Sequence, residues 1–152
     1  ILFSYHGLPE SHIRKADESN SHGKFVINED CCADPMDTCY RFQVFETTRL
    51  IVKQLQLKEG TYSNAFQSRL VNEPLLQPYT DTEIERFAKD GKKKLAVIAP
   101  AFVTDCLETL EEIAMEGKSQ FLDNGGESYK FVPCLNDNDD WVETIAKWIE
   151  RS

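Results

Sequence analysis

His6 is the first residue whose type and position could do chemistry. It directly follows a short apolar run, residues 1–5, and it precedes a glycine. An imidazole at such a strand end can accept a proton near neutral pH or ligate a divalent metal. It can equally be a turn histidine that is bonded to a backbone carbonyl. We therefore treat His6 as a candidate general base or metal ligand, with the turn interpretation as the alternative.

The second candidate is a row of three glutamates, Glu108, Glu112 and Glu116, spaced by four residues. Residues four apart share one face of a helix, and like charges at that spacing repel each other. Such a row can be an ordinary solvated acidic face. It can also pass a divalent cation or protons, because crowded carboxylates have raised pKa values and carboxylates bind hard cations. The sequence leaves both interpretations open.

Three of the five cysteines, Cys31, Cys32 and Cys39, lie within nine residues. They could hold a soft metal or an iron–sulfur cluster, but a four-thiolate site needs one more ligand nearby, and none is evident. We expect no cluster. Neither a Walker A motif nor a dinucleotide-binding glycine motif is present, which argues against the commonest nucleotide sites.

Apolar periodicity predicts the elements that would position these residues. Strands are expected at 1–5, 61–66, 94–99 and 128–132, and helices at roughly 38–56, 80–90, 105–124 and from 137 onward. Residues 10–37 are polar without a sustained period and are predicted to be a long excursion. Alternating strands and helices favour a three-layer α/β fold, with a four-stranded parallel sheet, helices on both faces and ligands at the carboxyl ends of the strands.

The predicted helix starts are assigned to polar side chains that can accept a hydrogen bond from the first helical turn. Thr80 or Asp81 is expected to begin the second helix, with Glu83 completing a capping box. The third and fourth helices are expected to start at Thr104 or Asp105 and at Asn136 or Asp137.

Composition excludes several classes. With 152 residues, 41% hydrophobic and 28% charged, the chain is expected to fold as one domain. A net charge of −9 disfavours nucleic acid as a partner. No apolar run approaches the length of a membrane-spanning helix, and an odd cysteine count suits a reducing compartment, so we expect a cytoplasmic location. The absence of an initial Met predicts a piece of a longer protein.

Six segments, spread in order along the chain, together resemble the ferrochelatases, the lyases that insert ferrous iron into a porphyrin to make haem. The segments are Phe3-Ser4-Tyr5-His6-Gly7-Leu8-Pro9, Cys39-Tyr40-Arg41 with Thr47-Thr48-Arg49, Phe66-Gln67-Ser68-Arg69, Glu73-Pro74 with Gln77-Pro78-Tyr79-Thr80-Asp81, Asp105-Cys106-Leu107-Glu108-Thr109-Leu110-Glu111-Glu112-Ile113, and Pro133-Cys134-Leu135-Asn136. The run Cys-Leu-Glu-Thr-Leu at 106–110 places the resemblance in a bacterial branch.

The resemblance implies that residues 1–152 form one α/β domain, the C-terminal half of a two-domain ferrochelatase (protohaem ferro-lyase). It implies insertion of ferrous iron into protoporphyrin IX, giving protohaem and two protons, in cooperation with an N-terminal half, so the isolated fragment is expected to be inactive. It maps the catalytic residues onto His6 and Glu108. The metal-binding set becomes His6, Glu108, Glu112 and Glu116, with the last two on a π-distorted helix.

The resemblance leaves some assignments open. The chain could serve a chelatase for another tetrapyrrole or for cobalt or nickel, or be a non-catalytic module that binds a tetrapyrrole or a metal. Some bacterial relatives carry a two-iron, two-sulfur cluster in the excursion, but here Phe25 stands roughly where a fourth ligand is expected. We expect no required cofactor, with ferrous iron as a substrate. A peripheral membrane contact is left open.

Overall fold

A four-stranded, all-parallel sheet forms the centre of the molecule. The computed structural model describes residues 1–16, 39–68 and 73–151. The strands are β1 (Leu2–His6), β2 (Ser63–Gln67), β3 (Lys94–Ile98) and β4 (Ser128–Val132), in the spatial order β2-β1-β3-β4. Because every pairing is parallel, all four carboxyl ends lie at one edge of the sheet. The four predicted strands and their parallel arrangement are confirmed.

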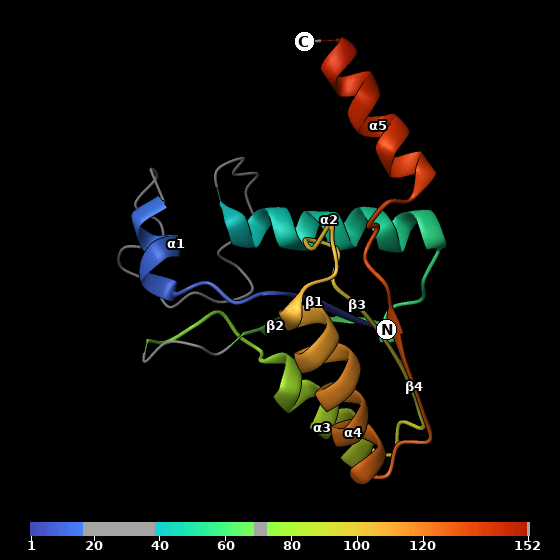
Figure 1. Ribbon diagram of the computed structural model, residues 1–152. Coiled ribbons are helices and arrows are strands. Elements are labelled where there is room, and N and C mark those ends of the chain that lie inside the picture. Colours follow the sequence, from blue (N-terminus) through green and yellow to red (C-terminus); the bar gives the residue numbers. More distant parts are fainter. Residues whose placement is uncertain (17–38, 69–72, 152) are drawn as a thin grey trace.

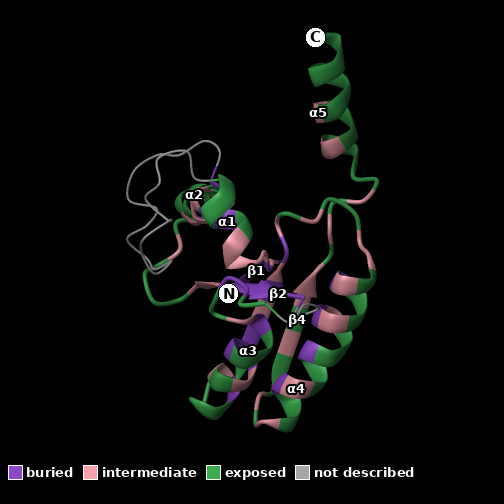
Figure 2. Cartoon of the chain, turned by 90° about the vertical axis from the view of Figure 1, so that its left-hand side faces the viewer, coloured by how far each residue is buried: buried purple, intermediate pink, exposed green. Residues whose placement is uncertain are grey.

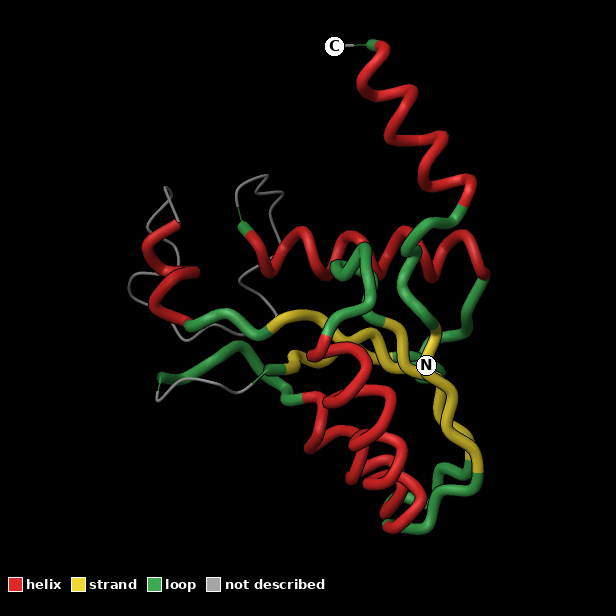
Figure 3. Tube along the Cα trace, in the orientation of Figure 1, coloured by secondary structure: helices red, strands yellow, loops and turns green. Residues whose placement is uncertain are grey.

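Helices cover both faces of the sheet, as Figures 1 and 3 show. Helix α2 (Tyr40–Leu55) lies on one face. On the other face lie α3 (Thr80–Lys89), the π-helix η2 (Glu108–Glu116) and α4 (Gly117–Asp123), which continues η2 directly. The predicted three-layer α/β fold is therefore confirmed, and the single helix expected at 105–124 consists of a π-helical and an α-helical part.

Two apolar clusters fill the space between the sheet and its helices. Successive side chains of β1 point to opposite faces, so Leu2 joins one cluster and Phe3 the other. The first cluster lies under α3 and α4, where Ile84 and Phe121 are fully buried. The second lies under α2. Figure 2 shows the buried parts of β1 and β2 between these layers, whereas no residue of β4 is buried.

The excursion predicted at 10–37 begins with a helix that the pattern did not indicate. Helix α1 (Glu10–Ala16) follows the first strand closely and buries a single apolar residue, Ile13. Ile13 and Ala16 are the only apolar residues among these seven and give no sustained helical period, which is why the sequence suggested an irregular segment. The rest of the excursion, 17–38, lies outside the described residues.

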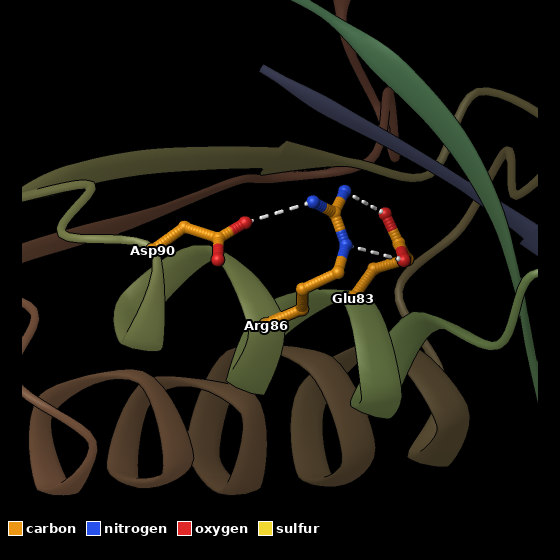
Figure 4. Close-up of polar contacts among 3 residues, drawn as sticks. All are labelled: Glu83, Arg86 and Asp90. Carbon is orange, nitrogen blue, oxygen red and sulfur yellow. Dashed lines mark hydrogen bonds and ion pairs between the residues drawn. The ribbon is translucent and has the colours of Figure 1, made fainter.

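Two predicted helix caps are wrong because other partners compete for the polar side chains. Helix α3 begins after Tyr79, and the hydroxyl of Thr80 lies 2.8 Å from that of Ser4 instead of capping. Glu83 forms no capping box, since both of its oxygens accept hydrogen bonds from Arg86, at 3.0 and 2.6 Å. Figure 4 shows that the same guanidinium also reaches Asp90.

The last helix, α5 (Asp139–Glu150), points away from the sheet (Figure 1). Its cap is Asn138, whose Oδ1 accepts from the backbone N–H groups of Asp140 and Trp141, so the expected Asn136 or Asp137 cap is wrong. None of its residues is buried. Within the described ranges, no helix has both the length and the apolar character that crossing a membrane requires.

Candidate active site

His6 occupies the carboxyl end of β1, and the residues around it fix the strand end tightly. The backbone N–H of Gly7 donates to the carbonyl of Gln67 at 2.8 Å. A Cβ at Gly7 would lie 2.7 Å from that same oxygen, so only glycine fits directly after the histidine. On the other side, the Tyr40 hydroxyl donates to the His6 carbonyl at 2.8 Å. Both contacts hold the backbone that carries the imidazole.

The imidazole of His6 is half-buried and has one committed nitrogen. Its Nδ1 lies 3.0 Å from the carbonyl oxygen of Gly7. A carbonyl can only accept, so Nδ1 carries the hydrogen and Nε2 of the neutral ring is left as the basic or metal-binding atom. The ring also packs against Phe102 from the loop after β3, with 6.2 Å between centroids. The turn bond and the chemical role are therefore compatible.

Glu108 is the first residue of η2 and lies within electrostatic reach of His6. Its pKa is lowered, mainly by a hydrogen bond with the Cys106 thiol and by a backbone hydrogen bond, and further by the positive charge that His6 can carry. Partial desolvation opposes these effects. The two residues chosen from the sequence as the catalytic pair thus both lie at the carboxyl edge of the sheet, His6 at the end of β1 and Glu108 at the start of η2.

Asp105 and Asn136 lock the start of η2 to the loop after β4. The Asn136 side chain donates to Asp105 Oδ2 at 2.8 Å and accepts from the Asp105 backbone N–H at 2.8 Å. The pKa of Asp105 is lowered, chiefly because of this Asn136 hydrogen bond, with smaller effects from Cys134 and Thr109. Neither residue caps a helix. Asp105, three residues before Glu108, and Asn136, in the loop after β4, instead join two strand-to-helix connections.

Glu112 and Glu116 differ in their surroundings although they line the same small cavity of about 50 Å³. Both carboxylate oxygens of Glu112 accept from Ser68, from its backbone N–H at 2.8 Å and its hydroxyl at 3.2 Å. Glu116 is exposed. The three predicted glutamates are therefore found in three environments: Glu108 near His6, Glu112 tied to the end of β2, and Glu116 near solvent.

The π-helix expected from the family resemblance is confirmed over Glu108–Glu116. Side chains from the sheet bond its carbonyl groups: Gln67 Nε2 donates to Glu108 O at 3.2 Å, and the Tyr129 hydroxyl donates to Ile113 O at 2.7 Å. A Cβ at Gly117 would lie 2.7 Å from that hydroxyl, so glycine at the end of η2 makes room for the bond.

The cysteines that the structure describes have local roles. Cys39 is buried and caps α2, since its Sγ accepts from the Phe42 N–H at 3.5 Å. Burial, followed by the bond to Asp105, raises the pKa of Cys134 to about 12. Cys31 and Cys32 lie outside the described residues. Within the ranges described, no three His, Cys, Asp or Glu side chains come close enough together to hold a metal ion.

Sequence reasoning selected His6 and the glutamates, but it assigned no role to Gln67 or Ser68 and expected Asp105 and Asn136 only as helix caps. Each of these four follows or ends a strand at the carboxyl edge, which is the signal that could have found them. Their types are common in turns and caps, and only the folded positions reveal that they contact η2 and each other.

The chain is an α/β domain with an all-parallel sheet, and a histidine and a carboxylate lie on neighbouring connections at the carboxyl edge of that sheet. The comparisons give the family: the ferrochelatase family model matches residues 1–152, and the chain belongs to that family. The chain is 49% identical over 159 residues to the ferrochelatase of Opitutus terrae, and this alignment covers 100% of the chain and 46% of the relative. The ferrochelatase of Pseudomonas fluorescens strain Pf0-1 is 45% identical over 156 residues, covering 100% of the chain and 45% of the relative. The chain therefore spans about half the length of these curated relatives.

Proposed function

We propose that this chain supplies one half of an enzyme that inserts ferrous iron into protoporphyrin IX, giving protohaem and two protons. The observation that carries the proposal is the placement of His6 and Glu108 at the carboxyl edge of the sheet, where Gln67, the cross-strand neighbour of His6, bonds the Glu108 carbonyl at 3.2 Å, in a chain that belongs to the ferrochelatase family. The second half of the protein, which the resemblance identifies as N-terminal, would form the opposite wall of the porphyrin site.

The His6 imidazole is suited to accept the protons that leave the porphyrin. A free porphyrin carries two N–H protons, and both must depart when the metal enters. Since Nδ1 is committed to the Gly7 carbonyl, Nε2 is the atom that accepts a proton or contacts the metal. Glu108 has a lowered pKa, so it is ionised near neutral pH and stabilises the imidazolium that forms.

The remaining carboxylates provide a route for the iron or for protons. A carboxylate has about four acceptor positions, and the two hydrogen bonds from Ser68 leave half of those on Glu112 available to a cation. Glu116 stands at the exposed end of the row. Oxygen ligands bind divalent iron weakly enough to release it again, which suits transfer of a substrate ion rather than storage.

The test uses the full-length protein that contains this chain. Zinc insertion into protoporphyrin is followed by fluorescence, and ferrous iron insertion by absorbance under anaerobic conditions. We expect the His6→Ala variant to lose about 10²–10⁴-fold in turnover, because a positioned base contributes that much. His12→Ala is the matched control, since His12 is an exposed histidine on α1, and it should keep normal turnover. Unchanged turnover in His6→Ala would refute the assigned role.

The same assay separates the alternatives. Faster insertion of cobalt or nickel than of iron, or turnover of a different tetrapyrrole only, would indicate a related chelatase. Tight porphyrin binding without any insertion would indicate a binding module.

We further propose that no iron–sulfur cluster is required, that the protein is cytoplasmic, and that the isolated half is inactive. A colourless sample after anaerobic purification would agree with the first, whereas a cluster spectrum would contradict it.

A further inference from the structure

We propose that Gln67 and Ser68, at the carboxyl end of β2, are a pair of positioning residues that set the placement of Glu108 and Glu112. This inference rests on the proposed function, since it concerns how the same site is held. The two adjacent residues contact η2 one turn apart: Gln67 bonds the Glu108 backbone carbonyl, and Ser68 bonds the Glu112 carboxylate.

The left-handed backbone conformation of Ser68 allows two adjacent residues to contact the same helix. Along a strand, successive side chains point to opposite faces, so two neighbours cannot both face the same helix. Ser68 has φ = 72°, in the region that non-glycine residues rarely adopt. This turns the chain at the strand end, so the N–H and hydroxyl of Ser68 reach the same helix as the Gln67 amide. Strained residues of this kind concentrate at functional sites.

A buried chain of hydrogen bonds fixes the Gln67 amide. Ser4 Oγ donates to Gln67 Oε1 at 2.7 Å, and it also lies 2.8 Å from Thr80 Oγ1. The exposed fractions of Ser4, Gln67 and Thr80 are 0%, 2% and 1%. With its oxygen used in this way, the amide must direct Nε2 outward, toward the Glu108 carbonyl. A buried, satisfied network allows little freedom of rotation.

The same strand pairing places both partners of the proposed catalytic pair. Gln67 is the cross-strand neighbour of His6 in the parallel register of β1 and β2. The imidazole is carried by one strand end, and the amide that holds the backbone of Glu108 is carried by the strand end beside it. The Gln67 contact therefore links the position of η2 directly to the position of His6.

The experiment measures steady-state kinetics of the full-length protein with zinc as the varied metal. Outer residues that orient metal-binding side chains typically change affinity by 10–100-fold. We expect Ser68→Ala and Gln67→Leu to raise the KM for zinc by about 10-fold, with the KM for porphyrin unchanged. Ser63→Ala is the matched control, because Ser63 begins the same strand and its buried hydroxyl has no hydrogen-bond partner among the described residues.

Two readouts separate positioning from general stability. Ser68→Ala should add nothing in a Glu112→Ala background, because residues that act through each other are not additive. Amide hydrogen exchange over 108–116 should become faster in Gln67→Leu and stay normal in Ser63→Ala. If Gln67→Leu does not fold, the KM for zinc is measured in Ser68→Gly instead. This variant removes only the hydroxyl that bonds Glu112, because glycine keeps the left-handed backbone and the N–H donor.

The outcomes are distinguishable from those of the proposed function. Wild-type protein without any metal insertion would overturn the proposed function, while the exchange measurement would still decide whether the strand end holds η2. An active wild type in which both substitutions leave the zinc KM and the exchange unchanged would overturn the positioning role. Fully additive effects of Ser68→Ala and Glu112→Ala would also contradict it.

Discussion

Two amphipathic helical segments of this chain, the η2–α4 segment and α5, have very different relations to the sheet. The first is held by hydrogen bonds from Gln67, Ser68 and Tyr129 and buries Phe121 completely. Helix α5 contacts the body so little that none of its residues is buried. The exposed fractions of Trp148 and Ile149 are 57% and 70%.

The difference shows that an apolar stripe does not by itself place a helix. Both segments carry such a stripe, and both were expected to cover the sheet. What distinguishes η2–α4 is a set of polar contacts from strand ends, which have direction and fix its rotation, in addition to burial. The site glutamates lie on the helix that has these contacts. Three substitutions and one pH titration, taken from the largest expected effect to the smallest, test this contrast.

Phe121→Ala should cause the largest loss of stability. Phe121 is fully buried and packs against Tyr129, with 6.0 Å between ring centroids. Removing it leaves a cavity under α4, so the free energy of unfolding should fall by about 3–5 kcal/mol. Urea denaturation of this chain measures the loss. A loss below about 1 kcal/mol would mean that α4 is held no more firmly than α5.

Asn136→Ala should cost less, because it removes hydrogen bonds without creating a large cavity. The Asn136 amide bonds the Asp105 carboxylate, the Asp105 N–H and the Cys134 carbonyl. Leaving these groups without their partner should lower the free energy of unfolding by about 1–3 kcal/mol. Asp137→Ala, at the exposed next residue, is the control and should change it by less than about 0.5 kcal/mol. Equal effects of the two substitutions would contradict the lock between the loops.

The hydrogen bond between Asp105 and Asn136 should also make stability depend on pH, with a smaller change in the free energy of unfolding than the Asn136→Ala substitution causes. The pKa of Asp105 is lower in the folded chain than its ordinary value, mainly because of Asn136. The contribution of Asp105 to the free energy of unfolding is therefore complete above the pKa that Asp105 has in the unfolded chain. It is lost as the pH falls through the pKa that Asp105 has in the folded chain. Urea denaturation from about pH 6 to about pH 2 should show this loss. Asn136→Ala should reduce the slope, and a slope equal to that of the wild type would refute the assignment.

Much of the fold was predictable from period and turn signals. The strand at 128–132 was placed without error, and the helix expected at 80–90 is found at Thr80–Lys89. Apart from the missed helix α1, the errors concern polar residues near element ends. Asn136 or Asp137 was expected to cap α5, but Asn136 adopts φ = 50° and bonds Asp105, and Asn138 is the cap. A sequence shows that such a side chain can accept a hydrogen bond, but the folded neighbours decide which donor it meets.

The candidate site was predictable in its chemistry and not in its support. His6 could be found because it ends an apolar strand, and Glu108 because it begins a row of glutamates. The contact of Ser68 with Glu112 spans 44 residues and depends on one left-handed backbone position. Nothing in a Phe-Gln-Ser sequence indicates that conformation, since serine does not require it. Long-range polar contacts of this kind follow only from the assembled sheet.

The smallest effect is expected for Trp148→Ala in α5. Trp148 contacts Trp141 of the same helix edge-on, with 5.9 Å between ring centroids. Because Trp148 is 57% exposed and no residue of α5 is buried, removing its side chain should change the free energy of unfolding of this chain by less than about 0.5 kcal/mol. Phe121→Ala, measured by the same urea titration, is the matched comparison, because both substitutions replace an aromatic side chain with alanine. A loss of several kcal/mol for Trp148→Ala would show that α5 packs on the domain in solution, and the contrast between the two helical segments would then disappear.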